Sequence, residues 1–177
     1  MIRSRAALVV LAVLFAVGCG ATTAPSMVAS GPEPAGPNPS ESATEVCAPD
    51  AQREIGLSLS LRLTAPIAPT WANHLYSCRY SYAIGGFTLS VKELSDQAAT
   101  DAYFGFLRTD PASQVALRGL GQAAFAGPEG IIVVRKDYKV LRVDATGLPA
   151  QFGQPPMTRA EAARRIASDI MACWNGS

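Results

Sequence analysis

The chain has 177 residues, with 15 Lys and Arg against 14 Asp and Glu, a single histidine and a formal net charge of +1. This near balance removes the electrostatic basis for nucleic-acid binding, which depends on clustered positive charge, so we expect no nucleic-acid partner. The length fits one domain with flanking segments.

Residues 1–18 predict a signal peptide. Arg3 and Arg5 precede an apolar run, 6–17, that is shorter than the roughly 20 residues a spanning helix needs. The run ends in "AVGC", which resembles the lipobox of bacterial lipoproteins. In that class the cysteine, here Cys19, is acylated through its sulfur and becomes the first residue of the mature chain. The alternative is an ordinary secretory signal in which Cys19 is incidental.

Residues 19–43 predict the lipidated cysteine followed by a disordered tether. The segment is rich in Pro, Ser, Gly and Thr and has almost no large apolar side chain, so it cannot bury enough surface to fold. The remaining residues, 44–177, are sufficient for a single globular domain.

The first half of this domain predicts one helix followed by strands. Residues 44–56 predict a short helix ended by a glycine. The alternating leucines of 57–63 favour a half-buried strand, with extension of the helix as the alternative. Residues 74–94 predict a hairpin whose turn is Gly85-Gly86.

The second half predicts a further hairpin between two helices. Ser95 is expected to cap a helix that ends near Leu107. Residues 115–130 are strand-like, and 131–145 predict a hairpin with a polar turn near residues 136–137. Residues 158–174 predict a helix opened by a Thr158–Glu161 capping box. Its apolar face is expected to carry Ala163, Ile166, Ile170 and Cys173. The order predicts an α+β domain, a mostly antiparallel sheet of about five to six strands packed with two to three helices.

Three cysteines remain when Cys19 is set apart: Cys47, Cys78 and Cys173. Outside the cytoplasm disulfides form, and the simplest outcome is one bond and one thiol. A bond between Cys47, on the predicted first helix, and Cys78, on the first hairpin strand, would join helix to sheet. This pairing is preferred, and the two pairings to Cys173 stay open because connectivity cannot be deduced from sequence alone.

Residues 46–174 resemble an actinobacterial, mycobacterial-type family of small secreted lipoproteins with a C-terminal domain of unknown function. The resemblance rests on "VCAP", "YSCRYSY", "RGLGQAAF" and paired strands before an alanine-rich C-terminal helix. It implies that Cys47 pairs with Cys78, and Cys173 departs from the family pattern. The family implies no established activity.

Nothing in the sequence forms a catalytic or metal-binding motif. His74 is the only histidine, and no G-x-S-x-G elbow accompanies it. The cysteines lack the spacing of metal ligands. We therefore expect a protein that is not an enzyme and has no cofactor. Tyr76, Tyr80 and Tyr82 share one strand face and are candidate ligand-facing aromatics, with packing in the core as the commoner use of such a stripe.

These features predict an extracytoplasmic lipoprotein, anchored to the outer face of the cell membrane, whose domain binds an envelope protein, a glycan or a lipid. The alternatives are a carrier of a lipid or other apolar ligand and, third, a cell-wall hydrolase. A cavity on the order of several hundred Å³ would favour the carrier. A solid core with one exposed apolar patch would favour the interaction domain. A cleft joining His74 to an acid and a nucleophile would favour the hydrolase.

Overall fold

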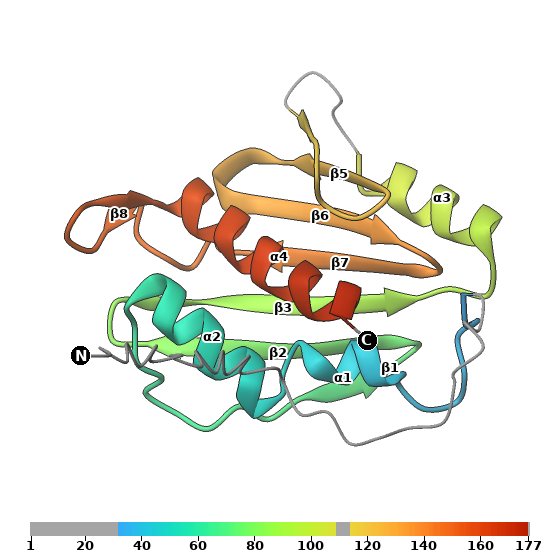
Figure 1. The fold of residues 1–177 in the computed structure, drawn as a ribbon, viewed down its shortest axis with the longest axis horizontal. Helices are drawn as coiled ribbons and strands as arrows, with labels where there is room; N and C mark the ends of the chain where they lie inside the picture. Colours follow the sequence, from blue (N-terminus) through green and yellow to red (C-terminus); the bar gives the residue numbers. More distant parts are fainter. Residues whose placement is uncertain (1–31, 109–113, 177) are drawn as a thin grey trace, which may run out of the picture. The chain divides into compact units, whose positions relative to one another are not determined.

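A computed structural model describes residues 32–108 and 114–176 of the chain (Figure 1). All described residues lie in one compact unit, Gly31–Ser177. The predicted signal peptide and Cys19 therefore lie outside the described residues.

Seven strands form one antiparallel sheet, in the order β1-β2-β3-β7-β6-β5-β4. Their bounds are β1 Thr70–Ala72, β2 Leu75–Tyr82, β3 Gly85–Glu93, β4 Val115–Leu117, β5 Ala123–Ala126, β6 Ile131–Lys136 and β7 Lys139–Asp144. A separate two-stranded ribbon pairs β8 Gln151–Phe152 with β9 Met157–Thr158. The predicted α+β class is confirmed, and the main sheet has more strands than predicted because its edges, β1 and β4, are strands of three residues.

Helices cover both faces of this sheet. The helices α1 Glu41–Glu45, α2 Pro49–Leu59 and α4 Arg159–Gly176 lie in front of it in Figure 1. The helix α3 Gln97–Phe106 packs on the opposite face against β6 and β7. A 3-10 turn, η2 Pro128–Gly130, precedes β6.

Alternation along β6 and β7 creates two cores. Val134 and Leu141 belong to the large core beneath α1, α2 and α4. Val133 and Val140 point the other way and pack with Phe125 against α3. Because successive strand residues face opposite sides, this hairpin is buried on both faces. The predicted hairpin is confirmed, with its turn at 137–138.

The predicted helix over 44–56 is wrong in its bounds, because two helices occupy this region. Ser40 caps α1, and its backbone N–H and hydroxyl both donate to the buried Glu93 carboxylate of β3. Pro49 opens α2 at a position that needs no N–H donor. Cys47 was expected on a helix and lies in the turn between α1 and α2.

Contacts with the sheet begin within the predicted tether. The Ala35 N–H donates to the carbonyl oxygen of Leu94 over 2.9 Å. Ala43, the last residue of the predicted tether, is fully buried. The packed domain therefore extends upstream of residue 44.

The predicted strand over 57–63 is wrong, and the helical alternative holds as far as Leu59. Burial of Ala51, Ile55 and Leu59 repeats every four residues, which is the helical period. The left-handed residue Ser60 ends the helix, and beyond it Leu63 forms a single bridge to Tyr82 of β2. The packing of α2 on α4 favours the helix, although the alternating leucines locally favour a strand.

The turn of the first hairpin lies at 83–84, so the two glycines expected to form it instead begin β3. Gly85 has a φ of +135°, and the neighbouring Gly86 N–H donates to the Gly147 carbonyl oxygen over 3.1 Å. A Cβ at Gly85 would collide with that carbonyl. Both the conformation and the close approach require glycine.

We expect Gly85→Ala to lower the free energy of unfolding by about 1–3 kcal/mol, because the added methyl is both strained and overpacked. Urea denaturation of the two proteins measures the difference. Gly105→Ala is the matched control: it lies in α3 with nothing within 4 Å of the added Cβ, so it should raise stability by up to about 1 kcal/mol. Equal losses at both positions would contradict the packing at Gly85.

The last two long helices largely follow their predictions. Asp96, one residue after the expected Ser95, caps α3 by accepting from the Ala99 N–H over 2.8 Å. At the start of α4 the Thr158–Glu161 capping box is present, with bonds of 3.2 and 2.7 Å. The buried face of α4 is made by Ala162, Ala163, Ile166, Ala167, Ile170, Met171 and Trp174. Cys173 was expected on this face but is exposed.

Within the described ranges, no helix has the length and apolar character needed to span a membrane.

Candidate binding site

A disulfide joins Cys47 to Cys78, as the preferred pairing predicts. It ties the α1–α2 turn to β2, with both cysteines buried. The Tyr80 hydroxyl donates to the Val46 carbonyl oxygen over 2.7 Å and holds the same turn from one residue away. Cys173 is outside the disulfide. The Cys47–Cys78 bond therefore stabilises the fold.

The three candidate tyrosines face the helices. Tyr80 is fully buried and its ring stacks on Phe87 with centroids 4.6 Å apart. Tyr82 is 5% exposed, and burial raises the pKa of its hydroxyl to about 12. Tyr76 is half-buried at the edge of the same core. Packing of the core accounts for the stripe, so we place the candidate site elsewhere.

His74 lies in the β1–β2 turn and fastens the chain upstream of α1. Its Nδ1 is 3.0 Å from the carbonyl oxygen of Gly36, which can only accept, so Nδ1 carries the proton. The Trp71 ring meets the imidazole edge-on at 5.8 Å, and its Nε1 donates to the Pro37 carbonyl oxygen over 3.0 Å. These contacts give the histidine a structural role.

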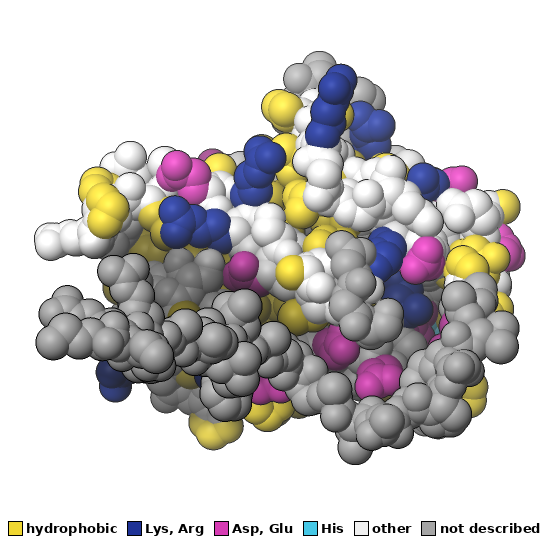
Figure 2. Space-filling model, in the orientation of Figure 1, with side chains coloured by type: hydrophobic (Ala, Val, Ile, Leu, Met, Phe, Trp, Pro, Cys, Tyr) yellow, Lys and Arg dark blue, Asp and Glu magenta, His cyan; other side chains and the backbone are white. Residues whose placement is uncertain are grey.

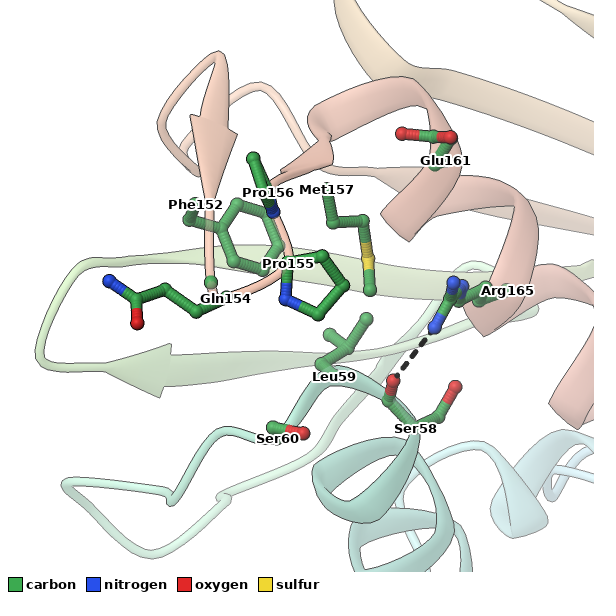
Figure 3. A pocket seen from close by; sticks show the side chains of 11 residues that line it. Ser58, Leu59, Ser60, Phe152, Gln154, Pro155, Pro156, Met157, Glu161 and Arg165 are labelled. Atoms are coloured by element: carbon green, nitrogen blue, oxygen red, sulfur yellow. Dashed lines mark hydrogen bonds between the residues drawn. The ribbon is translucent and has the colours of Figure 1, made fainter.

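A pocket of about 150 Å³ lies between the end of α2, the β8–β9 ribbon and the first turns of α4 (Figure 3). We call it the ribbon pocket. Figure 3 shows Leu59, Pro155 and Met157 gathered at its centre. Its lining is completed by Ser58, Ser60, Phe152, Gly153, Gln154, Pro156, Glu161 and Arg165. The pocket thus has an apolar interior and a polar rim.

The fold holds this pocket in shape. Leu59 and Phe152, on opposite sides, belong to the large core. Arg165 donates to the backbone carbonyl of Ser58 over 3.4 Å, which links α4 to the end of α2 (Figure 3). Glu161 accepts from the Thr158 N–H and hydroxyl, and these hydrogen bonds lower the pKa of its carboxyl. Both charged rim residues are thereby used in supporting the fold.

One further carboxylate lies behind the rim. Burial raises the pKa of Asp169, and a hydrogen bond with the Ser58 side chain offsets part of that shift. Its Oδ2 is buried and has no hydrogen-bond partner. Asp169 sits one turn after Arg165 on α4, so this carboxylate lies where α2 and α4 meet.

A shallower groove of about 530 Å³ runs along the other side of α2, and we call it the α2 groove. It is lined by Gln52, Arg53, Gly56, Leu57, Ser60, Leu61, Arg62 and Leu63. Leu57 is 68% exposed, and Ser60 lines both the groove and the ribbon pocket. Exposed leucine beside a preformed pocket is typical of a surface that binds an apolar group.

The apolar interior and polar rim of the ribbon pocket suit it to binding. The ribbon pocket has the volume of a cavity that accepts one ring-sized apolar group, about 150 Å³. Within residues 32–108 and 114–176, no cluster of three or more His, Cys, Asp or Glu could hold a metal ion.

Sequence reasoning did not find this site. Its residues come from 52–63 and 152–165, which have no shared motif. The alternating leucines of 57–63 were the available signal, and they were interpreted as a strand. No protein-family model, curated protein or solved structure matches this chain.

Proposed function

We propose that this chain is a lipoprotein held at the outer face of the cell membrane by lipid on Cys19, and that its domain binds an envelope protein without catalysing a reaction. One observation carries the binding part of the proposal: the ribbon pocket and the α2 groove adjoin at Ser60 and expose apolar side chains. The lipobox-like "AVGC" supports the location.

The shape of the surface favours a segment of protein as the occupant. The ribbon pocket accommodates one apolar side chain, and the α2 groove would receive the next part of the same segment across Leu57. Serine and glutamine at the rim offer hydrogen bonds to a peptide backbone. A lipid chain is the less favoured occupant, because the α2 groove is an open surface feature where Leu57 is 68% exposed.

A photo-reactive amino acid at position 57 tests the proposal in intact cells. We expect one discrete protein adduct from that position and none from the same amino acid at Phe106. Phe106 is a matched control because it is also exposed, at 72%, but lies on α3 across the sheet.

Binding of the purified partner then provides the quantitative measurement. Leu57→Lys is expected to weaken it about tenfold or more, because burying a leucine contributes roughly 1.5–3 kcal/mol. Phe106→Lys should leave the affinity within about twofold. Adducts with lipid alone would favour the carrier, and equal adducts from both positions would refute a binding role for this surface.

A further inference from the structure

Lys139, the first residue of β7, is a mostly buried cation whose ammonium makes no direct ion pair or hydrogen bond with the described residues. Its side chain is 9% exposed. No described carboxylate lies within 4 Å of its ammonium, and none of the described hydrogen bonds involves that group. Its cross-strand neighbour, Glu93, is turned toward Ser40 and accepts from that residue. The ammonium itself is not fully enclosed, so solvent, or a ligand in its place, can reach it.

The ammonium belongs to a polar pocket of about 210 Å³ formed by the β6–β7 turn, α1 and the end of α4. We call it the lysine pocket. Its lining consists of Ser42, Lys136, Asp137, Lys139 and Trp174. Lys136 donates to the Trp174 carbonyl oxygen over 2.6 Å, and Asp137 accepts from the Gln122 side-chain amide over 3.2 Å. Lys139 is therefore the donor that the pocket offers to a ligand.

A second pocket, of about 170 Å³, adjoins the first at Ser42 and carries the opposite charge. Its lining consists of Glu33, Ser40, Glu41, Ser42 and Glu45, and we call it the glutamate pocket. The Glu45 Oε2 is buried without a hydrogen-bond partner, and burial, with the charge of Glu41 added, raises the pKa of this carboxyl. Figure 2 shows acidic and basic side chains side by side over α1 and the β6–β7 turn.

We infer that these adjoining pockets bind a small zwitterion, a molecule or end group carrying one ammonium and one phosphate or carboxylate. Lys139 would bind the anionic end, Glu45 the ammonium, and the Ser42 hydroxyl would lie between them. An anion alone would be repelled by the neighbouring glutamates, and a cation alone would be repelled by the neighbouring lysines. A ligand with both charges satisfies the two unpartnered groups together.

Titration of the full chain with O-phosphoethanolamine, followed by amide NMR shifts, tests this site. We expect saturable shifts centred on Ser42, Glu45 and Lys139. Inorganic phosphate alone and ethanolamine alone should each bind at least about tenfold more weakly, because each contacts only one of the two charged groups. γ-Aminobutyrate, a zwitterion with a carboxylate, distinguishes a preference for phosphate from one for carboxylate.

Lys139→Gln and Glu45→Gln should each weaken binding of O-phosphoethanolamine about tenfold or more. The matched controls are Lys92→Gln, in β3, and Glu54→Gln, on the surface of α2; neither should change the affinity. Circular dichroism verifies that each variant folds. Absence of saturable shifts with both zwitterions would overturn the inference, as would binding that is unchanged in both Lys139→Gln and Glu45→Gln.

Discussion

Replacing Cys47 and Cys78 together with alanine is expected to lower the free energy of unfolding by about 3–4 kcal/mol. The disulfide closes a loop spanning 31 positions, and this constraint on the unfolded chain accounts for the expected loss. Both side chains are also buried, so the variant loses some packing as well. Denaturation in urea, with and without a reductant, measures the loss.

The Tyr80 hydroxyl bond to Val46 remains in that variant, so the α1–α2 turn keeps one attachment to β2. We therefore expect a folded but less stable domain. Cys173→Ala serves as the control: this residue is exposed and outside the disulfide, and its replacement should change stability by no more than about 0.5 kcal/mol. Equal stability of the oxidised and reduced wild-type protein would contradict the stabilising role of the bond.

Elements with strong local signals were predictable from the sequence. The β6–β7 hairpin has apolar residues on both arms and a polar turn between them, and the capping box of α4 is a local exchange between Thr158 and Glu161. Such features depend on neighbours along the chain, so the sequence contains all that is needed to recognise them.

The region around α2 was not predictable in this way. Leu57, Leu59, Leu61 and Leu63 alternate as in a strand, while Ala51, Ile55 and Leu59 repeat as in a helix. Contact with α4, more than 90 residues later, favours the helix up to Leu59. In this helix Leu57 is exposed. The apolar surface that we propose as a binding site therefore exists because tertiary packing selects the helical pattern over the strand pattern.

The two pockets around Ser42 were also hidden in the sequence. Glu45 and Lys139 are far apart along the chain, and their pockets adjoin at Ser42 because α1 packs beside the end of α4. The Trp174 Nε1 donates to the Ser42 carbonyl oxygen over 2.8 Å and fixes this corner. Neither charged residue belongs to a motif, and only their shared lack of a partner marks them.

The attachment of residues 35–37 to the sheet bears on how the domain would be presented at a membrane. The backbone of Ala35 bonds to Leu94, and His74 and Trp71 hold Gly36 and Pro37. The predicted tether therefore meets the domain at the β1–β2 turn. On our proposal this corner is where the domain continues, towards the N-terminus of the sequence, into the segment that carries the lipid.

Cys19→Ala is expected to move the protein from the membrane fraction to the soluble extracytoplasmic fraction. On our proposal attachment depends on the acyl chains, each buried methylene contributing about 0.8 kcal/mol. A single chain binds reversibly, whereas the two chains of a diacylglyceryl group give stable anchoring. Cell fractionation with immunoblotting measures the change.

Mass spectrometry separates lipid anchoring from retention through a protein partner. The wild-type chain should begin at Cys19 and carry the mass of a diacylglyceryl group, and Cys173→Ala should keep both the mass and the membrane location. Combining Cys19→Ala with Leu57→Lys distinguishes the two attachments, because any fraction retained through the α2 groove should be released only in the double variant. An unmodified N-terminus elsewhere than Cys19, or full membrane retention of that double variant, would refute the lipoprotein proposal.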